Sequence, residues 1–383
     1  MTLAPAPAST PSRDYRAEFP IFRDTNYLNS CSLGALSRRS RARVNECLDI
    51  WECRGAAAWY DVWWGALAEL RGRYGRIVGA PEGTIALHPN ISAALTAVAE
   101  SLDYGRRPKV VVSSLDFPTV AYQWLAKSGE AEVEIVESPD GVSVPLESFE
   151  RAVDDRTAIV ATSHVYFISG AIQDLAGLAK IAHRRGALLL ADGYQAAGQL
   201  PVDVRDLDVD FYCAGGLKWL LGGSGIAFLY TRQELLAGLA PRATGWFSQR
   251  DQFRFDPREM VWQDDARRLE AGTPSILSVY AQLGGLEVIE ELGTREIRRR
   301  TMVLTEDLIA SARAAGLRPK VATAPAVRSG IVMLPSDDPA RDVRRLAAER
   351  IVVDARPGHV RVSPYFYNVA DDGRAAIECL TRD

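Results

Sequence analysis

The chain has 383 residues, of which 25% are charged and 47% hydrophobic, and its formal net charge is −4. These values are ordinary for a globular protein, and the dispersed basic residues argue against a nucleic-acid partner. No window approaches the roughly 20 apolar residues of a membrane span. MTLAPAPASTPSR lacks the features of a secretory signal, so we expect a cytoplasmic protein that does not bind membranes.

The cysteines form no CxxC pair and no regular spacing, which argues against a disulfide framework and against a zinc site. We therefore expect no bound metal. The five cysteines are Cys31, Cys47, Cys53, Cys213 and Cys379.

The first part of the chain predicts a tail and two helices. Residues 1–13 are rich in Ala, Pro, Ser and Thr, which is typical of a disordered segment. Helical patterns follow over residues 38–51 and 60–78. An aromatic cluster on these stretches favours core packing or a dimer contact, with a substrate wall as the alternative. Its members are Trp51, Trp59, Tyr60, Trp63 and Trp64.

The segment IALHPNISAALTAVAESL predicts a strand, a turn and a helix. The first turn of this helix contains Asn90, Ile91 and Ser92. Because the backbone N–H groups at a helix start lack partners, this turn predicts an anion site. A plain N-cap at Asn90 is the alternative.

Further βα units predict a parallel, doubly wound α/β sheet. Strand-like runs occur in KVVVSS, EAEVEIVES and TAIVATSHV, and the helical stretch DLAGLAKIAHRRG ends at Gly186. His164 follows the third of these runs and is either a hydrogen-bonded core histidine or a ligand contact.

The stretch from Ala187 to Tyr230 holds three apolar runs of strand length. The first ends on Asp192, and the second ends in glycines and Lys218. Ligands of open α/β sheets bind outside the carboxyl ends of the strands. A desolvated lysine loses its proton more easily and can form a Schiff base, so we expect the ligand at Lys218.

After residue 265 the pattern changes to two long helices, followed by strands alternating with a helix. We therefore expect a disordered tail (1–13), a larger domain (14–264) and a smaller α+β domain (265–383). The first residues of the larger domain are expected to pack on the smaller one.

DGYQAAGQLPVDV and DFYCAGGLKWLLGGSG resemble the pyridoxal 5′-phosphate (PLP) site of the class V aminotransferase family, of fold type I. The similarity runs from about Tyr27 to about Asp371. It implies that PLP is the cofactor, that Lys218 is the Schiff-base lysine and that Asp192 pairs with the pyridinium nitrogen. A carboxylate there keeps the ring protonated and therefore a better electron sink. Gln195 is expected to reach the ring hydroxyl.

The resemblance implies further contacts. Asn90, Ile91 and Ser92 would hold the phosphate, Phe117 would stack on the ring, and His164 would lie beside the cofactor. Thr273 would be donated across a homodimer interface, so that the active site is shared. Arg361 would clamp the substrate carboxylate, with Arg356 as a weaker candidate. The remaining expected contacts are Ser32, Tyr60 and Tyr365 with the substrate and Trp246 with phosphate or substrate.

The chain departs from the family pattern at several of these positions. Gly215 and Leu217 stand where desulfurases have Ser and His as phosphate ligands, so the phosphate must be held elsewhere. Tyr166 and Phe167 stand where an asparagine often faces the ring hydroxyl. Phe117 replaces a histidine of desulfurases and cannot move a proton.

These residues favour β-elimination from an S-substituted cysteine, with Lys218 as the only base required. No cysteine lies between Cys213 and Cys379, which argues against desulfuration, and GAAAWYDVWW lacks the histidine of kynureninases. Lyases that the chain resembles serve ergothioneine and lincosamide pathways, so the resemblance implies a role in a sulfur-containing natural-product pathway such as antibiotic biosynthesis. The alternatives are decarboxylation-coupled oxidative deamination, transamination, epimerisation with a second base (Tyr60, Tyr166 or Tyr365), and a catalytically silent ligand-binding protein.

Overall fold

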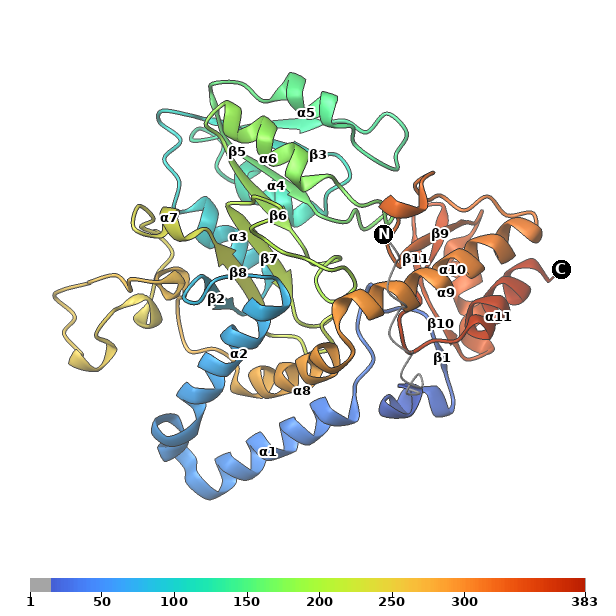
Figure 1. Ribbon diagram of the computed structural model, residues 1–383, viewed down its shortest axis with the longest axis horizontal. Coiled ribbons are helices and arrows are strands. Elements are labelled where there is room, and N and C mark those ends of the chain that lie inside the picture. The colour runs from blue at the N-terminus through green and yellow to red at the C-terminus, as the bar shows by residue number, and fades with distance from the viewer. Residues whose placement is uncertain (1–14, 383) are drawn as a thin grey trace, which may run out of the picture.

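A twisted sheet forms the centre of the larger part of the molecule (Figure 1). The computed structural model describes residues 15–382, so the predicted tail at 1–13 lies outside the described residues. Within 15–382 this sheet has seven strands. In sheet order they are β2 (Ile85–His88), β8 (Ala227–Thr231), β7 (Phe211–Gly215), β6 (Leu188–Asp192), β5 (Thr157–Ser163), β3 (Lys109–Ser113) and β4 (Glu132–Val136).

The sheet is parallel except at β8, which pairs antiparallel with both β2 and β7. Most of the strands are buried on both faces, which explains why they read as unbroken apolar runs. The prediction of a mainly parallel, doubly wound α/β sheet is confirmed. The carboxyl ends of β2, β7, β6, β5 and β3 lie at one edge of the sheet, where we expected the ligand.

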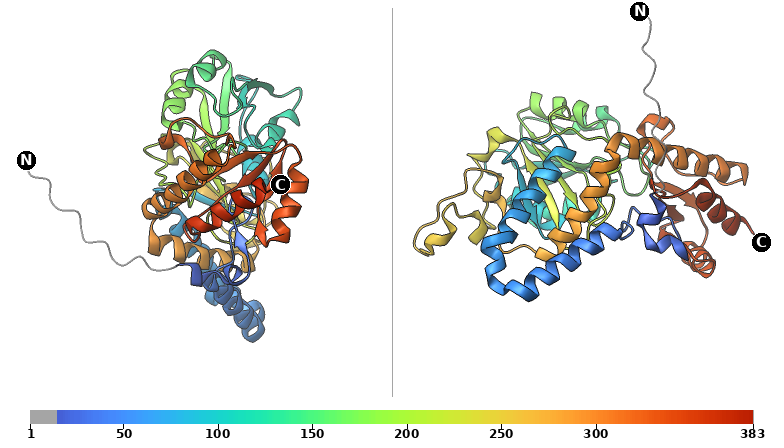
Figure 2. Two further views of the ribbon diagram at one scale, coloured as in Figure 1. Left: turned by 90° about the vertical axis from the view of Figure 1, so that its right-hand side faces the viewer. Right: turned by 60° about the horizontal axis from the view of Figure 1, so that its bottom comes forward.

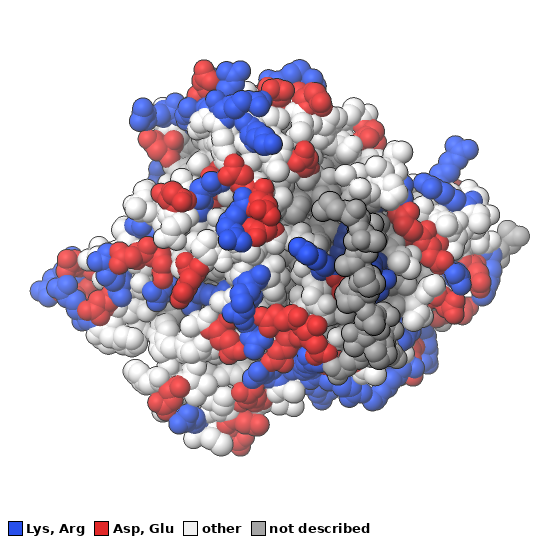
Figure 3. Space-filling model, in the orientation of Figure 1, with Lys and Arg blue, Asp and Glu red and all other residues white. Residues whose placement is uncertain are grey.

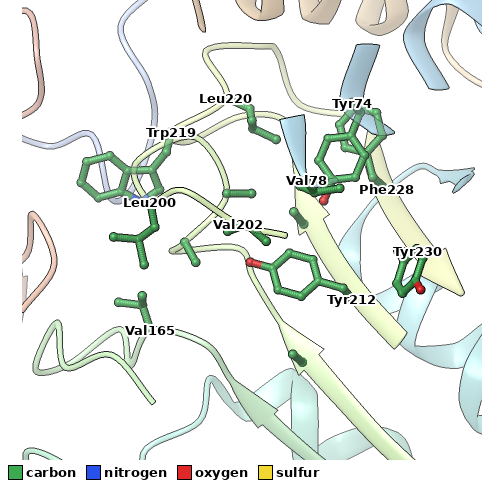
Figure 4. Packing of buried hydrophobic residues seen from close by; sticks show 14 of the residues in the cluster. Tyr74, Val78, Val165, Leu200, Val202, Tyr212, Trp219, Leu220, Phe228 and Tyr230 are labelled. Carbon is green, nitrogen blue, oxygen red and sulfur yellow. The ribbon is translucent and has the colours of Figure 1, made fainter. Parts of the chain in front are cut away.

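Helices cover both faces of the sheet. On one face, α3 (Ile91–Ala99), α4 (Pro118–Leu125) and the short α7 (Gln233–Leu236) share a core with Ala86, Leu190 and Phe211. On the other lie α2 (Trp64–Ile77), α5 (Leu146–Ala152) and α6 (Leu175–Arg184). The rings of Tyr74 on α2 and Phe228 on β8 stack there, with centroids 3.9 Å apart (Figure 4).

A long helix, α8 (Ile276–Leu292), packs against α1 (Arg38–Arg54) and α2. We expected it in the smaller domain. It instead joins the larger part, because it is buried on almost all sides and needs partners around its whole circumference. The right-hand view of Figure 2 shows α1 and α8 side by side.

The smaller part contains α9 (Thr294–Ala314), α10 (Pro339–Ala348) and α11 (Ala370–Thr381). Its antiparallel sheet has the order β11 (Asp354–Arg356), β12 (His359–Val362), β9 (Val332–Pro335). The short strand β1 (Asn26–Tyr27) pairs in parallel with β10 (Ile351–Val352). This pairing places the first described residues against the smaller part.

Short 3₁₀ turns and one π-helical turn connect these elements. The 3₁₀ turns are Arg16–Glu18, Pro20–Arg23, Gly55–Ala57, Trp246–Ser248, Gln252–Arg254, Ala266–Leu269 and Pro325–Val327, and the π-helical turn is Trp59–Trp63. Charged side chains of both signs are mixed over the face shown in Figure 3. Within residues 15–382, no helix is both long and apolar enough to cross a membrane.

Candidate active site

Lys218 lies in the loop after β7, at the carboxyl edge of the sheet. Its Nζ atom is 3.9 Å from the centroid of the Tyr194 ring. Burial lowers the pKa of Lys218 to about 8, although the negative charge of Asp192 opposes this shift. The N–H of Gly34 donates to the carbonyl of Leu217 (2.8 Å), so the segment after β1 lies against the lysine loop.

Asp192 is the last residue of β6 and is buried. Its Oδ1 accepts a hydrogen bond from the backbone N–H of Tyr194 (2.9 Å). Burial raises the pKa of Asp192, while this hydrogen bond and the charge of Lys218 act in the opposite direction. The structure thus places the expected acid and the expected amine within electrostatic range of each other, at the ends of the neighbouring strands β6 and β7.

The predicted anion site lies at the start of α3. Asn90 is the N-cap, and its side chain accepts from the N–H of Ala93 (2.9 Å). The N–H groups of Ile91 and Ser92 are left without intrahelical partners, as at any helix start. The hydroxyl of Ser92 lies 2.7 Å from that of Thr119 on α4. Asn90 therefore acts as an N-cap, and the turn still offers backbone donors to an anion.

The side chains of Gln195 and His164 already have protein partners. Gln195 donates to the carbonyl of Cys31 (2.9 Å) and accepts from the indole N–H of Trp219 (2.7 Å). One N–H of its amide is left for the expected contact with a ring hydroxyl. His164 is buried, and its Nδ1 lies 3.0 Å from the Tyr212 hydroxyl. Burial lowers the pKa of His164 to about 4, so the ring is neutral and fits the core-histidine alternative.

Phe117 is the N-cap of α4 and is 47% exposed. Its ring meets that of Phe167 edge to face, with centroids 5.2 Å apart. Phe117 and Phe167, two of the positions at which the chain departs from the expected family pattern, are therefore in contact. Together they form an apolar surface. Stacking of Phe117 on a cofactor ring stays a prediction.

Arg361 is buried on β12, and most of its guanidinium is already paired. Its Nε and Nη2 bind the two carboxylate oxygens of Asp354 at 2.9 and 2.6 Å. Nη2 also donates to the hydroxyl of Ser32 (2.7 Å), which in turn bonds to Asp354. Nη1 donates to the carbonyl of Phe167 (3.1 Å). Of the five N–H donors of an arginine, one is left over, so a bidentate clamp on a substrate carboxylate would have to displace one of these partners, such as the Ser32 hydroxyl or the Phe167 carbonyl.

Arg356 is the more available cation of this group. It contacts the same Asp354 at 3.1 Å and donates to the carbonyl of Ala355. Its side chain is 27% exposed, against 2% for Arg361. The two arginines and Asp354 carry a net charge of +1, which suits one additional carboxylate. We expected Arg356 to be the weaker candidate, whereas the structure leaves it more donors than Arg361.

The expectation that Tyr365 contacts substrate is wrong in this structure. Its ring is fully buried, and its hydroxyl lies 2.7 and 2.8 Å from the carbonyl oxygens of Gly198 and Trp219. These two carbonyls belong to the loops after β6 and β7. Tyr365 therefore supports the lysine loop from the smaller part and has no free face for a ligand.

Tyr60, Trp246 and Thr273 meet each other in a separate pocket of about 220 Å³. The pocket is lined by aromatic rings, and Lys218 is not part of its wall. The indole N–H of Trp246 donates to the carbonyl of Gln252 (2.9 Å), and its ring stacks on Phe255. Within one chain, these three residues therefore line a pocket whose wall does not include the lysine.

Three residues of the site escaped the sequence analysis. Tyr194 places its ring on the Lys218 amine, Asp354 holds Arg361, and the buried Cys31 lies within electrostatic range of both Lys218 and Arg361. Tyr194 could have been found, since it follows Asp192 by two residues. Asp354 carries no local signal, whereas Cys31 lies in YLNSCSLGALS, a segment within the stretch over which the family resemblance runs. Among residues 15–382, no group of three or more metal-ligating side chains comes together.

The chain is similar to known proteins in sequence and in fold. The sequence matches the family Aminotransferase class-V over residues 65–375. It is 32% identical to "Uncharacterized aminotransferase YcbU" of Bacillus subtilis, over 95% of this chain and 96% of that protein. It is 28% identical to a kynureninase of Bacillus cereus, over 97% and 91%. The fold is similar to that of the apo cysteine desulfurase from Thermococcus onnurineus NA1 (TM-score 0.88, 22% identity, 98% of each chain).

The residues present fit the cofactor of this family. A lysine of lowered pKa can bond to its aldehyde, a buried carboxylate can pair with its ring nitrogen, and the start of α3 can bind its phosphate. The chain belongs to the aminotransferase class-V family, and its cofactor is pyridoxal 5′-phosphate.

Proposed function

We propose that the protein is a carbon–sulfur lyase that catalyses β-elimination from an S-substituted cysteine or a related amino acid. The observation that supports this most is the environment of Lys218. This base has a pKa of about 8 and lies within electrostatic range of the guanidinium groups of Arg356 and Arg361. An amino acid held by its carboxylate at the arginines presents its α-carbon to that base. Elimination requires this one base and a leaving group, and no second acid–base side chain.

When bound, PLP makes the α-hydrogen of an amino acid acidic by delocalising the electrons released at the α-carbon. In the proposed reaction the Lys218 amine takes the α-proton, and the C–S bond breaks to release a thiolate. Hydrolysis with one water then yields pyruvate and ammonia, and the thiolate takes up a proton. Asp192 supplies the negative charge that favours a protonated ring nitrogen, and Arg356 with the free N–H of Arg361 holds the carboxylate.

Desulfuration is disfavoured because it needs an accessible nucleophilic thiol. Cys31 is the cysteine near Lys218, and it is fully buried. Burial raises the pKa of its thiol, although the charges of Arg361 and Lys218 lower it in part. A buried neutral thiol is a poor nucleophile.

The decisive experiment incubates holoenzyme with S-alkyl and S-glycosyl cysteines and measures pyruvate and free thiol. We expect both products in equal amounts, and neither from the Lys218→Ala variant. A keto acid formed without release of a thiol would favour transamination. An aldehyde together with carbon dioxide would favour oxidative deamination, and a D-amino acid would favour epimerisation. Anthranilate from kynurenine would favour the activity named for the 28% identical relative. A role in natural-product assembly stays a prediction.

A catalytically silent relative would differ in a simpler test. The purified protein should be yellow, and borohydride should fix the cofactor covalently on Lys218. A colourless protein that takes up no PLP would contradict both the activity and the role of Lys218.

We also infer a homodimer in which Thr273 completes the partner's site. The pocket that contains Thr273 lies in a patch of exposed aromatic side chains, and exposed apolar patches of this kind mark interfaces. The most exposed aromatic side chains of the pocket wall are Tyr60 (72%), Phe253 (50%) and Phe255 (71%).

Subunit mixing tests this proposal. Lys218→Ala and Thr273→Ala proteins are each expected to be impaired, whereas a mixed dimer would contain one intact site. Recovery of activity on mixing, to about a quarter of the wild-type value when chains assort at random, supports donation of Thr273 to the partner. A monomer in sedimentation analysis, or a dimer without recovery, contradicts it.

A further inference from the structure

The carboxyl edge of the sheet carries three neighbouring positions on one face. Side chains alternate along a strand, so Asp192 shares a face with Leu190, Gly215 with Cys213, and His88 with Ala86. Those apolar neighbours all belong to the core beneath α3 and α4. Gly215 pairs with Ala227, which pairs with His88. At a spacing of about 4.8 Å per strand, the Gly215 and His88 backbones are therefore about 10 Å apart.

Tyr194 lies over Gly215 on this face. Its ring packs against the same core and covers the Lys218 amine. A Cβ atom on Gly215 would collide with Cε2 and Cζ of the Tyr194 ring and would lie 2.8 Å from its hydroxyl oxygen. The ring therefore requires glycine at position 215. The Tyr194 hydroxyl occupies the place that a short polar side chain at position 215 would reach.

The Tyr194 hydroxyl is available for a ligand. Among residues 15–382 it has no hydrogen-bond partner, and its residue is partly exposed. The start of α3 lies close by, because α3 packs against β7 and β8. There the N–H groups of Ile91 and Ser92 are free, and Nε2 of the buried His88 also lacks a partner within the described chain. An anion at this helix start would thus have unpaired polar atoms around it.

We propose that the Tyr194 hydroxyl donates a hydrogen bond to the phosphate of the cofactor, so that Tyr194 and Gly215 together replace a hydroxyl-bearing side chain at position 215. Burial and the nearby charge of Asp192 raise the pKa of Tyr194, which keeps the hydroxyl protonated and able to donate. The inference rests on the cofactor and not on β-elimination, so cofactor binding tests it whatever the reaction is.

The first experiment titrates apo-protein with PLP and with pyridoxal, which lacks the phosphate. Tyr194→Phe removes a single oxygen atom and keeps the ring over Gly215. Because this change removes a hydrogen bond to a charged group, we expect Tyr194→Phe to lose about tenfold or more in PLP affinity. Pyridoxal affinity should not change. Tyr74→Phe is the matched control: the Tyr74 hydroxyl, like that of Tyr194, has no hydrogen-bond partner among the described residues, but this tyrosine is fully buried and packs on the other face of the sheet.

An equal loss of PLP and pyridoxal affinity in Tyr194→Phe would overturn the proposal, because the hydroxyl would then act on the ring or on Lys218. Unchanged affinity for both would overturn it as well.

A second experiment exchanges the two residues. Tyr194→Ala should weaken PLP binding, and adding Gly215→Ser should recover part of it, because the serine then fits where the ring was. The double variant should bind PLP several-fold more tightly than Tyr194→Ala alone, again without a change for pyridoxal. A folded double variant that binds PLP no better than Tyr194→Ala would contradict the idea that both positions serve the same anion.

Discussion

Replacement of Asp354 by asparagine should destabilise the protein by leaving the Arg361 charge buried and incompletely paired. The carboxylate makes two hydrogen bonds to the guanidinium, at 2.9 and 2.6 Å, and the two side chains are 19% and 2% exposed. Removing one member of a buried ion pair typically costs 3–5 kcal/mol. Arg361 keeps its contacts with Ser32 and Phe167, so we expect the lower end, about 3 kcal/mol.

The assay is chemical unfolding of the apo-protein, arranged as a double-mutant cycle with Arg361→Met. Removal of both charges should cost less than the sum of the two single changes, by about 2 kcal/mol. Glu132→Gln is the matched control, because Glu132 pairs with Arg156 on the surface, where both side chains are about 60% exposed. Such exposed pairs contribute about 0–1 kcal/mol. A loss below that of the control, or strict additivity in the cycle, would refute the importance of the buried pair.

The pH dependence of the pair has a defined sign. Burial alone would raise the pKa of Asp354, but the hydrogen bonds and charge of Arg361 outweigh it, and the pKa lies below its ordinary value. The contribution of the pair to stability is therefore complete above the unfolded-state pKa, about 3.9, and is lost as the pH falls through the lower native value. Asp354→Asn should remove this acid-dependent component.

Three further outcomes follow from the site. The rate at which apo-protein takes up PLP should rise with pH and level off above about 8, where the Lys218 amine is deprotonated. In Asp192→Asn the rate should level off at a lower pH, because the Asp192 carboxylate raises the pKa of the lysine. A stopped-flow pH series measures both profiles, and identical profiles would contradict the coupling between the two residues. Tyr365→Phe should lower the unfolding free energy by about 1 kcal/mol with little change in KM, whereas a large rise in KM would restore Tyr365 as a substrate contact. Gly34→Ala should impair PLP binding, measured by titration, because its Cβ would collide with the Lys218 carbonyl oxygen; wild-type affinity would show that the segment after β1 can move away.

Several features could be predicted from the sequence because they follow local patterns. Apolar runs of strand length gave the sheet, and a carboxylate and an amine directly after two of these runs placed Asp192 and Lys218 at its carboxyl edge. The N-cap at Asn90, which we gave as the alternative to an anion site, followed from its place before an apolar helical segment. In each case the residue's place at the end of a strand or the start of a helix follows from neighbours within a few positions of the chain.

Long-range packing decided the rest. Nothing local indicates that Arg361 is held by Asp354, that Tyr365 is buried against two loops of the larger part, or that α8 leaves the smaller part. The exchange between Tyr194 and Gly215 depends on the volume shared by two adjacent strand ends, which are 21 residues apart along the chain. The sequence by itself thus determined which chemical groups reach the site. The tertiary structure decided which of them are free to act, because that depends on the partners packing brings to each donor and acceptor.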